Sequence, residues 1–158
     1  MSSRFRRSLV LTTLLALVLA ASGAATDPAD TKLGRIDVDK TTIPELQRLM
    51  NARRLSSVEL TNFYVKRIYQ LDKTLNAVIT VSSTAAEDAR AADRARRNGD
   101  RRPLLGIPII VKDNVNTTGM PTTAGSYALF KSTPGDAFIA KQLKAAGAII
   151  IGKANLSE

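Results

Sequence analysis

The sequence predicts an α/β fold, in which N-terminal helices precede a βαβαβ run that forms a mostly parallel sheet covered by helices. Two observations lead to this prediction. The apolar runs at 104–111 and 148–151 show no alternation, which is typical of strands covered on both faces. Helix-start signals separate the predicted strands, so strands and helices alternate along the chain, as in α/β proteins with right-handed crossovers.

Three helix starts fit the capping box, in which a hydroxyl side chain is followed by Glu three residues later. They lie at Thr42, Ser56 and Thr84. The first predicts a short helix to about residue 51, and the second a longer helix with one apolar face. The third predicts an Ala- and Arg-rich helix that ends at Asn98-Gly99, a typical C-terminal cap.

Strands are predicted at 76–81, 104–111 and 148–151, because these segments are short, apolar and rich in β-branched residues. A further helix is expected from Asp136 to Gly147 between the last two strands. The chain ends on another N-cap pattern at 155–158, Asn-Leu-Ser-Glu. Since a helix start there would leave the last strand uncovered, we expect the chain to be the front piece of a longer protein.

Residues 1–25 have the three-part layout of a secretory signal peptide. Three arginines precede an apolar stretch from Leu9 to Ala21, and small residues follow, with cleavage expected after Ala24 or Ala25. The apolar stretch is shorter than the roughly 20 residues of a membrane span. We therefore expect a secreted or exported protein, by the general or the twin-arginine route, with no stable membrane association after cleavage. An uncleaved signal acting as a membrane anchor is the alternative.

The 158-residue chain contains no His, no Cys and no Trp, and its formal net charge is +9. The absence of Cys excludes a thiolate nucleophile, a disulfide framework and a zinc finger. The absence of His excludes a Ser-His-Asp triad and imidazole metal ligands. We expect no cofactor and no metal, and any acid–base chemistry near neutral pH must use Lys, a carboxylate or Tyr.

Six arginines cluster at 90–102, yet no aromatic residue lies between Tyr69 and Tyr127. Single-stranded nucleic acid is usually held by aromatic side chains beside the basic ones. The cluster therefore indicates a solvated helix face that runs into an exposed loop, and we expect no nucleic-acid partner.

Ligands of open α/β sheets bind beyond the carboxyl ends of the strands, and two lysines occupy such positions, Lys112 and Lys153. A Lys desolvated there can act as a base. The alternative for each is a side chain whose stem packs on the core while its ammonium reaches water. Lys112 is the better candidate, because the polar residues Asp113 and Asn114 follow it and the long loop 116–132 is expected to cover it.

Three separated segments, 106–114, 119–126 and 147–158, together resemble the amidase signature family. The resemblance runs from about Ile36 to the end of the chain. It implies an amide hydrolase with a Ser–cis-Ser–Lys triad, in which Lys112 is the general base and the small-molecule substrate is an amide. In this family both serines belong to a Gly/Ser-rich stretch, which would lie beyond Glu158.

The signal-peptide pattern and the resemblance together divide the chain into a signal peptide at 1–25 and the N-terminal part of an amidase domain at 26–158, truncated before the nucleophile segment. The chain would thus hold an incomplete piece of the amidase signature fold, and alone it would lack both catalytic serines. A catalytically inactive fragment and a secreted, non-enzymatic binding module are the alternatives. The oligomeric state stays open. The family also includes amidotransferase subunits that act on charged transfer RNA, and the export signal argues against that branch.

Five further residues are candidates for supporting the site. Asp113 and Asn114 could orient Lys112, although turn formation after the strand explains both equally well. Thr123, Gly125 and Ser126 lie in the loop expected to cover the site, where the Ser126 hydroxyl could bond within the site or only stabilise the loop. A Ser126–Lys112 dyad working alone is a third hypothesis.

Overall fold

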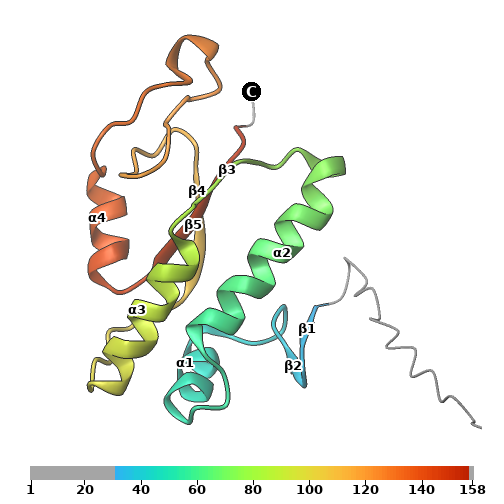
Figure 1. Cartoon of the computed structure of the whole chain (residues 1–158), viewed down its shortest axis with the longest axis vertical. Coiled ribbons are helices and arrows are strands. Elements are labelled where there is room, and N and C mark those ends of the chain that lie inside the picture. The colour runs from blue at the N-terminus through green and yellow to red at the C-terminus, as the bar shows by residue number, and fades with distance from the viewer. Residues whose placement is uncertain (1–30, 157–158) are drawn as a thin grey trace, which may run out of the picture.

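The computed structural model describes residues 31–156 (Figure 1). The predicted signal peptide at 1–25 and the last two residues of the predicted terminal helix start lie outside this range. The elements in chain order are β1 (Lys32–Leu33), β2 (Ile36–Asp37), α1 (Ile43–Asn51), α2 (Ser57–Leu75), β3 (Val78–Val81), α3 (Ala85–Arg97), β4 (Pro108–Lys112), a 3-10 helix (Tyr127–Leu129), α4 (Phe138–Ala145) and β5 (Ile149–Ala154).

The main sheet has the strand order β3-β5-β4. β4 and β5 are parallel, with Lys112 opposite Ala154, so the predicted β4-α4-β5 unit is confirmed. β3 is antiparallel to β5, so the prediction of a mostly parallel βαβαβ sheet is wrong for this strand. The cause lies at the end of α2, where Asn76 takes a left-handed conformation. The next residue, Ala77, accepts a hydrogen bond from the amide of Asn155 just past β5, so β3 starts where β5 finishes and runs back.

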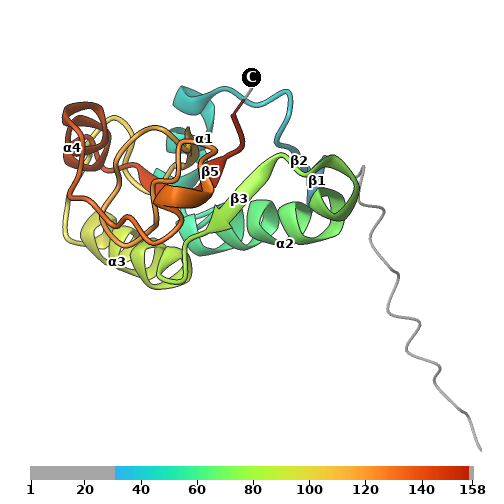
Figure 2. The ribbon, with the colours of Figure 1, turned by 90° about the horizontal axis from the view of Figure 1, so that it is seen from above.

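Both faces of β5 are covered, as its unbroken apolar sequence predicted. Ile149 and Ile151 pack with buried alanines of α3, whereas Ile150 packs with Val111 and with Ala140 of α4. Figures 1 and 2 show α2 and α3 side by side, with α4 set apart from them across the sheet. No helix within residues 31–156 is both long enough and apolar enough to cross a membrane.

Two of the three predicted caps form a side-chain hydrogen bond. Ser56 makes a full capping box with Glu59: its hydroxyl accepts from the Glu59 amide at 3.1 Å, and the Glu59 carboxylate accepts from the Ser56 amide at 2.8 Å. Thr42 also caps its helix. The prediction of a capping box at Thr84 is wrong, although Thr84 is the N-cap residue of α3. The Thr84 hydroxyl instead donates to the Asp88 carboxylate at 2.9 Å, one turn into the helix.

The helix predicted from Asp136 starts two residues later, at Phe138. The Asp136 carboxylate accepts from the Thr118 amide at 2.7 Å and from the Lys144 ammonium at 2.8 Å. It therefore ties the long loop to α4. The predicted end at Gly147 is confirmed, since this residue follows the helix with a φ of +96°.

Candidate functional site

The parallel pairing of β4 and β5 brings the two candidate lysines to the same end of the sheet. Lys153 lies opposite Val111, and Lys112, one residue further on, lies opposite Ala154. Their environments differ: the Lys153 side chain is fully buried, whereas Lys112 is exposed. Backbone register thus makes the two lysines neighbours along the sheet, and burial makes them chemically different.

The Lys153 ammonium is enclosed by oxygen acceptors. It donates to the Pro121 carbonyl at 3.1 Å, the Thr122 hydroxyl at 3.0 Å and the Asp113 carbonyl at 3.3 Å. The Asp113 carboxylate lies 3.6 Å from it. Burial lowers the pKa of Lys153, and the Asp113 carboxylate opposes that shift. This side chain therefore holds the loop to the sheet and has no open side toward a substrate.

Asp113 is the counterpart of Lys153 and is also fully buried. Its carboxylate accepts two hydrogen bonds from Thr123, one from the amide at 3.0 Å and one from the hydroxyl at 2.5 Å. Burial raises the pKa of Asp113, but the Thr123 hydrogen bonds and the Lys153 ammonium outweigh it and hold the pKa below the usual value. The carboxylate is therefore ionised at neutral pH and anchors the loop segment 121–123.

Lys112 stands apart from this buried pair. Successive residues of a strand point to opposite faces, so Lys112 and Asp113 diverge at the strand end. Within residues 31–156 no hydrogen bond or ion pair engages the Lys112 ammonium. Asn114 is exposed in the following turn, which closes when the Val115 amide donates to the Lys112 carbonyl at 2.9 Å. The expectation that loop 116–132 covers Lys112 is wrong, since the loop segment 121–123 lies over Lys153 instead.

The other three predicted supporting residues, Thr123, Gly125 and Ser126, are linked to Asp113 by hydrogen bonds that all involve Thr123. The Gly125 amide donates to the Thr123 hydroxyl oxygen at 3.2 Å, and Gly125 has a φ of +72°, which a glycine adopts readily. The Ser126 amide donates to the Thr123 carbonyl at 2.8 Å, and its side chain is exposed. The structure thus joins Thr123, Gly125 and Ser126 to Asp113, and in the described part of the chain no hydrogen bond joins Ser126 to Lys112.

The pairing of Asp113 with Lys153 was not predicted from the sequence. The signal was present: a Lys after an apolar run and an Asp after a second one are opposite charges at the ends of two strands. Parallel neighbours would bring such charges together. In residues 31–156 no three side chains of His, Cys, Asp or Glu gather as they would around a metal ion. The arrangement offers one exposed primary amine, that of Lys112, beside a fully buried ion pair.

Comparison with known proteins finds relatives among amidases and amidotransferases. The family model described as Amidase matches residues 59–158. A glutamyl-tRNA(Gln) amidotransferase subunit from Aromatoleum aromaticum is 45% identical over 119 residues, which cover 74% of this chain and 24% of the relative. A putative amidase of Schizosaccharomyces pombe is 42% identical over 130 residues, which cover 80% of this chain and 22% of the relative.

Solved structures give the same picture. Native peptide amidase from Stenotrophomonas maltophilia superposes with a TM-score of 0.73 at 46% identity, over 75% of this chain and 25% of that one. An amidase family protein from Bacillus anthracis has a TM-score of 0.70 at 40% identity, over 83% of this chain and 29% of that one. The chain thus spans about a quarter of the length of the relatives that it matches.

Proposed function

The chain belongs to the amidase signature family, and from this premise we propose that it supplies the lysine base of an enzyme that hydrolyses carboxamides. The observation that carries the proposal is the position of Lys112. It ends a parallel strand, where ligands of α/β sheets bind, and its ammonium has no partner among the described residues.

The reaction follows the Ser–cis-Ser–Lys scheme that the family resemblance implies. Lys112 accepts a proton through a bridging serine, while a second serine attacks the carboxamide carbon. The tetrahedral intermediate collapses to an acyl-enzyme as the C–N bond breaks, and the nitrogen takes a proton and leaves as ammonia or an amine. Water then adds to the acyl group and releases the carboxylic acid and the free serine.

Lys153 does not fit the role of the base, although burial lowers its pKa in the direction that a base requires. Its ammonium is closed off by Asp113, Pro121 and Thr122. A general base must come within hydrogen-bond reach of the proton that it accepts, and this lysine would have to break its contacts with the loop to do so. We assign Lys153 and Asp113 to positioning the strand end that carries Lys112.

Activity requires the two serines, which the resemblance places beyond residue 158. We therefore propose that these 158 residues alone release no ammonia from amides and that a chain which also carries the two serines does. The substrate class is narrowed by residues 1–25, whose signal-peptide pattern favours an extracellular small amide or peptide amide over charged transfer RNA. Mass spectrometry of the exported protein tests whether residues 1–25 act as a signal peptide, and a mature N-terminus after Ala24 or Ala25 is the expected result.

The assay for the base compares variants of the protein extended past codon 158. Release of ammonia from simple carboxamides should be abolished by Lys112→Ala and equally by Lys112→Arg, because a guanidinium stays protonated and cannot accept a proton. Lys141→Ala is the matched control, since Lys141 is an exposed lysine of α4. Full activity of the Lys112→Ala protein would contradict the assignment.

A further inference from the structure

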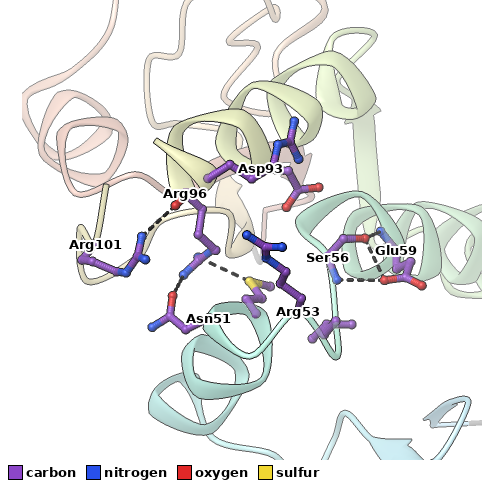
Figure 3. Close-up of a pocket in the computed structure, with 10 residues that line it drawn as sticks. Asn51, Arg53, Ser56, Glu59, Asp93, Arg96 and Arg101 are labelled. Atoms are coloured by element: carbon purple, nitrogen blue, oxygen red, sulfur yellow. Dashed lines mark hydrogen bonds between the residues drawn. The ribbon is translucent and has the colours of Figure 1, made fainter. Parts of the chain in front are cut away.

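A pocket of about 330 Å³ lies between α1, the start of α2 and the C-terminal half of α3 (Figure 3). Four arginines are its most prominent lining residues: Arg53, Arg96, Arg97 and Arg101. In Figure 1 the C-terminal end of α3 lies at the opposite end of the molecule from the carboxyl end of β5. The pocket is therefore separate from the site at Lys112.

Arg96 is the buried member of this set, with 7% of its surface exposed. Its guanidinium donates to the side-chain carbonyl of Asn51 at 2.5 Å, to that of Gln47 at 2.8 Å and to the Leu105 backbone carbonyl at 2.6 Å. These three acceptors and a fourth, the Met50 sulfur at 3.5 Å, are all neutral, and the buried Arg96 Nε has no partner. Burial is the largest influence on the pKa of Arg96 and lowers it. A buried cation is costly unless an anion accompanies it.

The two carboxylates in the pocket are already engaged at the start of α2. Asp93 accepts from the amides of Ser57 at 2.8 Å and Val58 at 3.2 Å. Glu59 accepts from the amide and the hydroxyl of Ser56. Asp93 lies close enough to favour the charged form of its neighbour Arg96. Even so, no ion pair joins any of the four arginines to a carboxylate within residues 31–156.

We propose that this pocket binds an oxyanion, a phosphate or carboxylate group carried by a small molecule. Guanidinium groups match the planar or tetrahedral geometry of such groups through paired N–H donors. Figure 3 shows Arg53 reaching the pocket from the α1–α2 connection and Arg96 from α3. The amides at the start of α2 take no part, because the carboxylates of Asp93 and Glu59 already cap them.

The test is a calorimetric titration of the 158-residue chain with inorganic phosphate and, separately, with citrate, at constant ionic strength. We expect saturable binding of at least one of the two, and the tighter one identifies the anion chemistry. The double variant Arg53→Gln/Arg97→Gln should weaken that binding about tenfold or more. Both side chains are exposed and make no hydrogen bond in the described residues, so the fold should survive.

The matched control is Arg90→Gln/Arg94→Gln, which also removes two positive charges, but from exposed positions of α3 that do not line the pocket. It should bind as tightly as the unaltered chain. If both double variants bound the anion equally weakly, the anion would be attracted by the net positive charge of the chain and not by the pocket, and the proposal would be overturned. An absence of saturable binding to both anions would overturn it too.

Discussion

The carboxylate of Asp113 lies 3.6 Å from the ammonium of Lys153, and both side chains are completely buried. Asp113 is the first residue after β4, and Lys153 lies within β5. Between them they bind the backbone or side chains of Pro121, Thr122 and Thr123. This pair therefore fixes the long loop to the sheet, next to the candidate base Lys112.

Breaking the pair should destabilise the chain strongly. Lys153→Met and Asp113→Asn should each lower the free energy of unfolding by about 3–5 kcal/mol, because each leaves a buried polar group without its partner. The double variant should lose less than the sum of the two. Urea unfolding followed by circular dichroism measures all three. Lys112→Met, at the exposed neighbouring position, should stay within about 0.5 kcal/mol of the unaltered chain, and losses no larger than this in the single variants would refute the prediction.

Stability should fall in acid. The pKa of Asp113 in the folded chain is lowered from the usual 3.8, so its stabilising effect is complete above about pH 4 and disappears as the pH falls through the folded-state pKa. Unfolding free energies measured across this range should fall less steeply for Asp113→Asn than for the unaltered chain. The pKa of Asp136 is also lowered, because hydrogen bonds from Lys144 and Thr118 outweigh burial, so part of the acid effect should remain. Identical slopes in the two proteins would contradict the assignment to Asp113.

The approximate positions of the four α-helices and of β3 and β5 were predictable because their signals are local, whereas β1, β2 and the 3-10 helix were not predicted and β4 begins at Pro108, four residues after the start predicted for it. Hydroxyl caps, apolar periodicity and the glycine at 147 each act within a few residues. The direction of β3 was not predictable in this way. It depends on the left-handed Asn76 and on the contact between Ala77 and Asn155, which are far apart in sequence.

The same distinction applies to the candidate site. Lys112 stands at the end of an apolar run, so its place at the end of a strand could be read from the sequence alone. The burial of Lys153 could not, because it depends on the register of β4 with β5 and on the path of a loop with little regular structure. Sequence therefore located both lysines, but only the structure distinguished the bonded one from the free one.

The two N-caps that look alike in sequence should respond differently to truncation. Ser56→Ala should cost about 0.5–2 kcal/mol of unfolding free energy, because the hydroxyl accepts from the amide of Glu59. Thr84→Ala should cost less, about 0.5 kcal/mol or below, because its hydroxyl accepts no capping hydrogen bond from the helix. Urea unfolding of the two variants tests the contrast, and equal losses would mean that Thr84 caps α3 in solution.

Two glycines with the same backbone angle separate conformational strain from steric overlap. Gly99 and Gly147 both have a φ of +96°, which disfavours any residue with a Cβ. A Cβ added at Gly99 would meet nothing within 4 Å, whereas one at Gly147 would lie 2.6 Å from the Cα of Leu105. That backbone cannot move freely, because the Gly106 amide donates to the Gly147 carbonyl at 2.9 Å and Leu105 itself is buried.

Gly99→Ala should therefore lower the free energy of unfolding by about 1–2 kcal/mol through strain alone. Gly147→Ala should lower it by a further 1–3 kcal/mol or so, because the turn at 104–107 must shift away from the end of α4. The difference between the two urea midpoints isolates the overlap, since strain is common to both variants. Equal midpoints would show that the turn at 104–107 shifts at little cost in free energy. The position of this turn before β4 would then not depend on its contact with the end of α4.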